Sequence, residues 1–137
     1  MLSPSKIEKI KNDILGKKYD LSTAYVSESK SREINKKYRS KDKPTNVLSF
    51  ALRDDVGEII LCKVVIKKEA KNFNKTFDQF LGFLVIHGML HLKGFEHSST
   101  MEKLEQEYDQ KYFYRNRRGL YHDASRSGRI LKRRKKS

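Results

Sequence analysis

The segment from Thr76 to His97 places the strongest constraint on the fold of this 137-residue chain. Thr76 and Gln79 have the spacing of a capping box, in which two side chains satisfy unpaired backbone groups at the start of a helix. The apolar residues that follow would cover most sides of that helix: Phe77, Phe80, Leu81, Leu84, Val85, Met89 and Leu92. A helix with so broad an apolar surface has to be surrounded by other elements. The pattern therefore predicts a central, buried helix.

The last turns of this helix carry two histidines, and a third follows shortly after. His87, His91 and His97 are three of the four histidines in the chain. Residues four apart share one face of a helix, so His87 and His91 can point toward one location. Gly94 can end the helix at no steric cost, and the chain can then turn so that His97 reaches the same place. Three imidazoles with an open fourth position are typical of a catalytic zinc site.

Other interpretations of the three histidines remain open. A buried polar cluster or a histidine patch facing RNA would use the same residues, and imidazoles also bind nickel, cobalt and copper. Metzincin proteases share the spacing, but they place a glutamate after the first histidine as the general base. This chain has Gly88 at that position, and glycine cannot abstract a proton. The pattern therefore favours a metal site with a substrate other than a peptide.

The charge of the chain predicts a polyanionic partner, because the net charge is +14. Residues 1–114 hold 21 Lys and Arg against 16 Asp and Glu, whereas residues 115–137 hold 10 against 1. A basic segment also suits an anionic membrane, but this one has few apolar anchors, so RNA is the favoured partner. We expect residues 1–114 to form one catalytic domain and residues 115–137 to form a flexible basic arm.

Composition also predicts a cytoplasmic protein without a membrane span. No apolar run approaches the roughly 20 residues that a membrane-spanning helix requires, and the N-terminal residues lack the apolar stretch of a signal peptide. The single cysteine, Cys62, excludes an internal disulfide and sits in an apolar run, as a core residue would.

Shorter patterns predict the remaining elements. We expect helices at residues 7–14, 29–38 and 67–72, and a last helix that opens with a capping box of Ser99 and Glu102. We expect strands at residues 21–26, 47–52 and 58–66, with a loop at 39–44 and a turn at 54–57. The run 58–66 is apolar almost throughout, which is typical of a central strand.

Two separated motifs resemble those of the YbeY-type endoribonucleases, which are bacterial ribosomal-RNA maturation factors. The run HGMLHLKGFEH at residues 87–97 is similar to the family signature, and YRSKDKPTNVLSF at 38–50 is similar to a second hallmark. GEII at 57–60 resembles the strand that follows. The family usually has tyrosine and aspartate where this chain has Phe95 and Glu96.

The resemblance implies an α+β fold in which about four to five helices pack with a small mixed sheet around a zinc-binding central helix. It implies a single-strand-specific, zinc-dependent endoribonuclease that acts in ribosomal RNA maturation and ribosome quality control, with one Zn²⁺ per chain. The family's metal ligands fall on His87, His91 and His97, and its functionally important arginine falls on Arg39. The implied partners are single-stranded RNA, ribosomal RNA, the small ribosomal subunit and a ribosome-associated GTPase.

Residues around Arg39 are candidates for contact with RNA. A guanidinium grips phosphate bidentately, so Arg39 could stabilise charge in the transition state. Lys41 and Lys43 are further candidates, as are the polar residues Thr45, Asn46 and Ser49. Without the resemblance, Arg39 would be interpreted as a solvated charge, and the polar residues equally as caps of a turn and of strand ends.

Two alternatives to a nuclease remain. The chain could be an RNA-binding ribosome-assembly factor in which zinc holds the loop at 93–98 and catalysis is minimal. It could also be a hydrolase that acts on another substrate.

Overall fold

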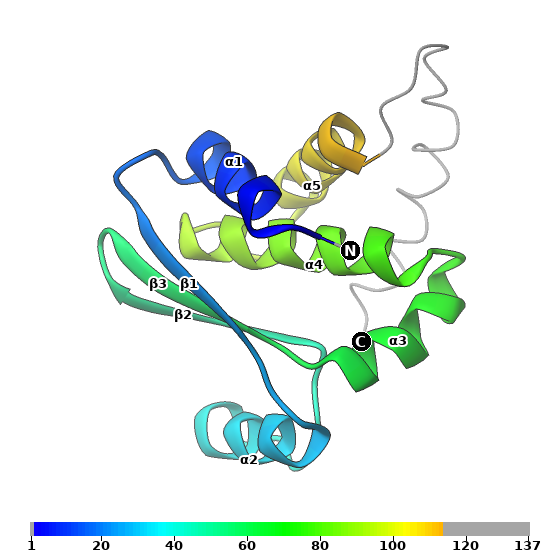
Figure 1. Ribbon diagram of the computed structural model, residues 1–137. Coiled ribbons are helices and arrows are strands. Elements are labelled where there is room, and N and C mark those ends of the chain that lie inside the picture. The colour runs from blue at the N-terminus through cyan, green and yellow to red at the C-terminus, as the bar shows by residue number, and fades with distance from the viewer. Residues whose placement is uncertain (1, 114–137) are drawn as a thin grey trace.

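The computed structural model describes residues 2–113 of the chain. Helix α4 (Phe77–Leu92) runs through the middle, with α1 (Pro4–Ile14) and α5 (Ser99–Phe113) on one side and a sheet on the other (Figure 1). The remaining elements are β1 (Asp20–Tyr25), α2 (Glu28–Arg39), β2 (Val47–Arg53), β3 (Val56–Leu61), α3 (Lys63–Ala70) and the 3₁₀ turn η1 (Lys71–Phe73). This arrangement confirms the expected α+β class.

The sheet has three strands in the order β1-β3-β2. β1 pairs with β3 in parallel, and β2 pairs with β3 antiparallel, so the sheet is mixed as expected. A tight turn at Asp54 and Asp55 joins β2 to β3. The strands β1 and β2 therefore form the two edges of the sheet, and β2 is the edge strand that packs against α4.

The central position of α4 follows from its apolar surface. Phe80, Leu81, Leu84 and Val85 are fully buried, and they form one core with residues from α1, α3, β3 and α5. The expected capping box is present: the Thr76 hydroxyl accepts from the backbone N–H of Gln79, whose side chain accepts from the Thr76 N–H. Burial on nearly all sides fixes the direction in which the C-terminal end of α4 points.

The strand expected at residues 58–66 is wrong in its second half. β3 ends at Leu61, and the chain then forms α3. The buried residues here are Cys62, Val65, Ile66 and Ala70, and this spacing is helical, while Val64 is 44 % exposed. A run of β-branched residues favoured a strand, but packing against α4 favoured the helical period.

Two further expectations need correction. The helix expected at 67–72 is the end of α3 followed by η1. The cap of α5 is Ser98 and not Ser99, because the Ser98 hydroxyl accepts from the Met101 N–H at 3.2 Å. Neighbouring serines look alike in sequence, and the course of the loop after His97 selects between them.

The expected basic arm at 115–137 lies outside the described residues. Within residues 2–113, no helix has the length and apolar character needed to cross a membrane.

Candidate metal centre

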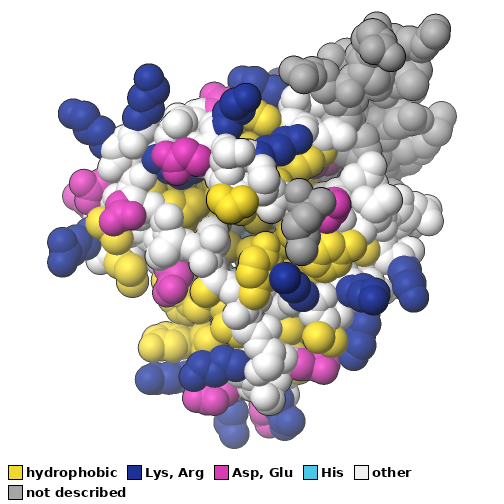
Figure 2. Space-filling view, viewed as in Figure 1, with side chains coloured by type: hydrophobic (Ala, Val, Ile, Leu, Met, Phe, Trp, Pro, Cys, Tyr) yellow, Lys and Arg dark blue, Asp and Glu magenta, His cyan; other side chains and the backbone are white. Residues whose placement is uncertain are grey.

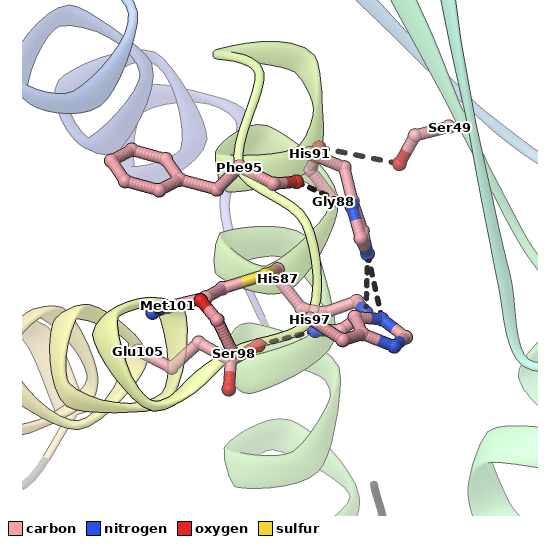
Figure 3. Close-up of polar contacts among 9 residues, drawn as sticks. All are labelled: Ser49, His87, Gly88, His91, Phe95, His97, Ser98, Met101 and Glu105. Carbon is pink, nitrogen blue, oxygen red and sulfur yellow. Dashed lines mark hydrogen bonds and ion pairs between the residues drawn. The ribbon is translucent and has the colours of Figure 1, made fainter.

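The side chains of His87, His91 and His97 converge at the C-terminal end of α4. His91 Nε2 lies 3.1 Å from His87 Nε2 and 2.9 Å from His97 Nε2. His87 and His91 stand one turn apart on α4, and the turn at Gly94 (φ 110°) returns the chain so that His97 faces them (Figure 3). The three residues together could hold a metal ion.

The hydrogen bonds of the other ring nitrogens direct these Nε2 atoms. His91 Nδ1 donates to the carbonyl oxygen of Phe95 at 3.0 Å. His87 Nδ1 contacts the Oε2 atom of Glu105, a carboxylate that α5 brings to the site (Figure 3). In a neutral imidazole whose proton is on Nδ1, the Nε2 atom carries the lone pair that can bind a metal. His87 and His91 therefore present lone pairs to one point, which is the electronic arrangement that a cation requires.

The electrostatics of the cluster keep His91 neutral. Its pKa is lowered from 6.5 to about 4, mainly because burial removes water and also because His87 and His97 repel a positive charge. Only a neutral imidazole can ligate a metal, so this environment holds the ring in its binding form across physiological pH.

The geometry fits zinc. Tetrahedral zinc with Zn–N bonds of about 2.0–2.1 Å separates its ligand nitrogens by roughly 3.3 Å. The observed Nε2 separations of 2.9 and 3.1 Å need only small outward movements to match this value. Three imidazoles, one of them supported by a carboxylate, form a donor set typical of zinc.

Glu105 is a residue that sequence reasoning missed. It is 4 % exposed, and it lies on the same buried face of α5 as Met101 and Asp109. Asp109 in turn lies 3.6 Å from Nζ of Lys75, and both side chains are almost completely buried. Burial raises the pKa of Asp109 to about 6, although the Lys75 charge opposes the shift. The signal in the sequence was the spacing of acidic residues at 105 and 109 along an otherwise apolar stripe.

The histidines open onto a cleft of about 790 Å³ whose opposite wall is basic and polar. All the candidate residues line this cleft: Arg39, Lys41, Lys43, Thr45, Asn46, Ser49, His87, His91 and His97. Arg39 is the last residue of α2, and it is exposed. Among residues 2–113, no acidic side chain forms an ion pair with Arg39. The structure thus brings together two motifs that stand about 40 residues apart in the sequence.

Hydrogen bonds to residues of α2 and α3 fix the loop that carries these residues. Ser31 Oγ donates to the Thr45 carbonyl oxygen at 2.8 Å and accepts from the Thr45 N–H at 2.9 Å. Asn35 Nδ2 donates to the Lys43 carbonyl oxygen at 2.8 Å. Asn46 Nδ2 donates to Glu69 Oε1 at 2.7 Å. The loop that forms this wall of the cleft is therefore fixed by hydrogen bonds, and the side chains of Lys41 and Lys43 are exposed on it.

Gly88 allows β2 to approach α4 closely behind the histidines. A Cβ atom at this position would lie 2.9 Å from Ser49 Oγ and 3.1 Å from Ile59 Cδ1. Ser49 Oγ donates to the Gly88 carbonyl oxygen at 3.2 Å (Figure 3). The absence of a side chain, which excludes a protease base, thus also has a packing reason. Glu96, which directly precedes His97 and stands where the family usually has aspartate, is exposed.

Fold and site together define a small α+β protein in which three histidines that could hold a metal ion line a cleft with exposed cations on its opposite wall. A family model described as "Endoribonuclease YbeY" matches residues 4–116. The chain belongs to the YbeY endoribonuclease family.

Individual relatives agree with this assignment. The chain is 38 % identical over 112 residues to Endoribonuclease YbeY of Staphylococcus carnosus. The aligned region covers 73 % of this chain and 70 % of the relative. It is 44 % identical over 96 residues to Endoribonuclease YbeY of Colwellia psychrerythraea, with 65 % and 62 % covered. The solution structure of TM1509 from Thermotoga maritima is similar with a TM-score of 0.61 and 35 % identity, over 80 % of this chain and 78 % of that one.

Proposed function

We propose that this chain is a zinc-dependent endoribonuclease that cuts single-stranded RNA. The observation that carries the proposal is the convergence of three Nε2 atoms on one side of a cleft whose other side presents exposed cations. A metal centre facing a cationic wall suits a phosphodiester, because both stabilise the charge that gathers on a phosphoryl group. Membership of the YbeY family supports RNA as the polyanion.

In this proposal His87, His91 and His97 hold one zinc ion. When bound, zinc would act as a Lewis acid toward a phosphoryl oxygen and lower the pKa of water to about 7. Glu105 fixes the ring of His87 through Nδ1, and the Phe95 carbonyl fixes His91. His87 and His91 would thereby be oriented before the metal binds.

The basic wall would position the RNA. Arg39 would hold the scissile phosphate with its guanidinium, and Lys41 and Lys43 would neutralise neighbouring phosphates. Thr45 and Asn46 line the same wall and would donate hydrogen bonds to the backbone or bases. Ser49 already donates to the Gly88 carbonyl, so its oxygen is better suited to accept a hydrogen bond from the RNA than to donate one.

Family membership supports a narrower biological role. We propose that the substrate is ribosomal RNA of the small subunit and that the protein acts in its maturation and in ribosome quality control. A ribosome-associated GTPase would be a partner in that setting, and the site of action would be the cytoplasm.

One observation favours the second candidate, an RNA-binding assembly factor in which zinc has a structural role. Gly88 replaces the base that metzincins use, and Glu105 is engaged with His87. Cleavage would then lack the carboxylate base that metzincins place directly after the first histidine.

Cleavage of a labelled single-stranded RNA separates the two candidates. The metal-loaded protein should cut the RNA, a chelator should abolish cutting, and zinc should restore it. His91→Ala should lose both zinc and cleavage, whereas Lys30→Ala, a change of an exposed cation at the start of α2, should lose neither. A His91→Ala protein that has lost zinc yet cuts at the wild-type rate would reject the proposal. Binding of RNA with zinc present and no cleavage would favour the assembly factor.

A further inference from the structure

An aromatic pair stands next in sequence to two residues that line the cleft, Arg39 and Ser49. Tyr38 directly precedes Arg39 on α2, and Phe50 directly follows Ser49 on β2. The two rings meet edge to face, with centroids 5.2 Å apart and an interplanar angle of 69°. Arg39 and Ser49 line the cleft, whereas Tyr38 and Phe50 are not among its lining residues. Ser49 points toward α4, and successive strand residues face opposite sides, so Phe50 and the Tyr38 ring beside it lie outside the cleft, one residue along the chain from its wall.

Tyr38 is exposed but held in place. Its exposed fraction is 59 %, among the largest of any hydrophobic side chain in residues 2–113. Single exposed apolar residues are common, so exposure alone indicates nothing. Here, however, Phe50 supports the ring on one edge, and Lys37 Nζ lies 5.3 Å from the ring centroid. The result is a fixed π surface beside a cation.

The surroundings of Tyr38 suit an anionic ligand. The last turn of α2 carries Lys36, Lys37 and Arg39. In the face drawn in Figure 2, basic side chains lie around the α2 end of the molecule, with some acidic side chains among them and hydrophobic side chains next to them. Of the nearby acidic groups, Asp42 is paired with Arg32 at 2.7 Å, and Glu58, which lies opposite Phe50 in the sheet, is partly buried.

We propose that Tyr38, braced by Phe50, is a stacking platform for an unpaired nucleobase of the RNA strand that enters the cleft. The proposal rests on the proposed function and adds a specific contact to it. Proteins that bind single strands combine a cationic track for the phosphates with aromatic side chains on which bases stack. A strand whose phosphate reaches Arg39 would place a neighbouring base near Tyr38. A duplex would not use the platform, because its bases already stack on each other.

The chain contains a matched control for this contact. Tyr25 on β1 is 42 % exposed, and Lys63 Nζ lies 4.3 Å from its ring centroid. Tyr25 therefore has the same local chemistry as Tyr38. It lies, however, on β1, the edge strand opposite β2, whereas Tyr38 directly precedes Arg39, which lines the cleft.

The test measures RNA binding by the metal-loaded full chain and by Tyr38→Phe, Tyr38→Leu, Tyr38→Ala and Tyr25→Ala. The probe is a set of single-stranded 2′-O-methyl RNA oligonucleotides with 2-aminopurine at successive positions, checked on a gel to be intact afterwards. Stacking on a tyrosine quenches 2-aminopurine. Tyr38→Phe should retain affinity and quenching. Tyr38→Ala and Tyr38→Leu should bind roughly 5- to 150-fold more weakly and lose quenching at one position. Tyr25→Ala and all duplex controls should be unchanged.

The leucine variant separates stacking from a structural role. Leucine keeps an apolar contact with Phe50 but has no π face, so wild-type binding by Tyr38→Leu would overturn the platform, as would a reduction in binding of the same size in Tyr25→Ala. The proposed function is tested apart from this result. If the wild type cuts RNA and the Tyr38 variants bind normally, only the platform fails. If the wild type binds RNA and does not cut it, the proposed nuclease function is rejected, and the quenching of 2-aminopurine still tests whether Tyr38 stacks on a base.

Discussion

At the scale of single residues, the partners of the Nδ1 atoms explain why His87 and His91 direct their Nε2 atoms to the same point. Imidazole has two chemically similar nitrogens, and which one faces a metal depends on what the other one bonds. The Phe95 carbonyl and the Glu105 carboxylate make that choice for His91 and His87. His91 donates to a backbone carbonyl, so no substitution of the Phe95 side chain removes that acceptor. The carboxylate that contacts His87, in contrast, is removed by substitution of Glu105.

Glu105→Ala should weaken zinc binding by about 10- to 100-fold, because removal of an outer partner of a metal ligand typically has that effect. Glu105→Gln should lose less, since its amide oxygen can still accept from His87 Nδ1. Competition with a zinc-chelating dye measures the affinities, and thermal melting of the metal-free proteins reports any loss of folding separately. Glu107→Ala, at an exposed position on the same helix, is the control. Wild-type zinc affinity in a folded Glu105→Ala protein would contradict this role.

Arg39→Ala should lower the rate of RNA cleavage by about 10²- to 10³-fold, the usual effect of removing one donor that stabilises transition-state charge. Its melting temperature should stay close to that of the wild type, because Arg39 is exposed and forms no ion pair within residues 2–113. Single-turnover cleavage and melting on one preparation test both statements. An unchanged rate would return Arg39 to the role of a solvated surface charge.

These residues differ in how well the sequence predicts them. The grouping of His87, His91 and His97 follows from helix geometry and a glycine turn, which are local rules. The contact of Glu105 with His87 crosses from one helix to another over 18 residues, and its register depends on how α5 packs. Local rules do not contain that information. The roles of Arg39 and its neighbours remain predictions, although the structure places them in the same cleft as the histidines.

At the scale of elements, the same division between local and tertiary information appears. The capping box at Thr76 and the breadth of apolar surface predicted α4 and its central position correctly. For α3, intrinsic preference and tertiary packing disagreed. Val64, Val65 and Ile66 are β-branched, yet the helix forms because it buries Val65 and Ile66 against the core and leaves Val64 outside. Elements with one dominant local signal were predictable, and elements with competing signals were not.

A buried ion pair joins α5 to the residue that precedes the N-cap of α4. Lys75, just before α4, lies 3.6 Å from Asp109 on α5, with 2 % and 3 % of the two side chains exposed. Lys75→Met should destabilise the fold by about 3–5 kcal/mol, since it leaves a buried carboxyl group without its cation. The double variant Lys75→Met/Asp109→Leu should be close to the wild type in stability or above it. Urea unfolding measures the three free energies, and a double variant as unstable as the single one would show that the charges themselves are required.

The same pair predicts a dependence on pH. Burial raises the pKa of Asp109 to about 6 in the folded protein, against 3.8 as its ordinary value. The folded state therefore binds this proton more tightly than the unfolded state does. The contribution of Asp109 to the free energy of unfolding is therefore fully present below about pH 4 and is lost as the pH rises through about 6. The free energy of unfolding of the double variant, relative to the wild type, should consequently increase between these values. Urea unfolding at several pH values checks this sign.

At the scale of the whole molecule, the charge is divided unevenly. Residues 1–114 carry 21 cations and 16 anions, so most of the +14 net charge belongs to residues 115–137. The family match ends at residue 116 and thus covers the body and almost none of this basic segment. The expected division into a catalytic body and a basic arm stays a prediction. Its physical content is that chemistry and long-range attraction to RNA reside in different parts of the chain.

Deletion of residues 115–137 should weaken RNA binding without removing the chemistry. The deleted segment holds 10 Lys and Arg against 1 Asp, and each phosphate that it neutralises releases counterions. The logarithm of the binding constant should therefore fall less steeply with the logarithm of salt concentration, by roughly 0.7 for each single-strand phosphate that is no longer neutralised. The body should stay folded, since α5 ends at Phe113, whose ring packs against Gly82 of α4.

Titrations of single-stranded RNA at several salt concentrations, with zinc analysis and cleavage at saturating RNA, test the deletion. The shortened protein should keep its zinc and its maximal cleavage rate while its affinity and salt slope both decrease. Substitution of the same ten cations by glutamine in the full-length chain separates charge from length, and it should reproduce the deletion. Equal affinity and slope before and after deletion would mean that the segment does not contact RNA. Loss of zinc or of cooperative unfolding would instead make residues 115–137 part of the catalytic body, against the division that the charge pattern predicts.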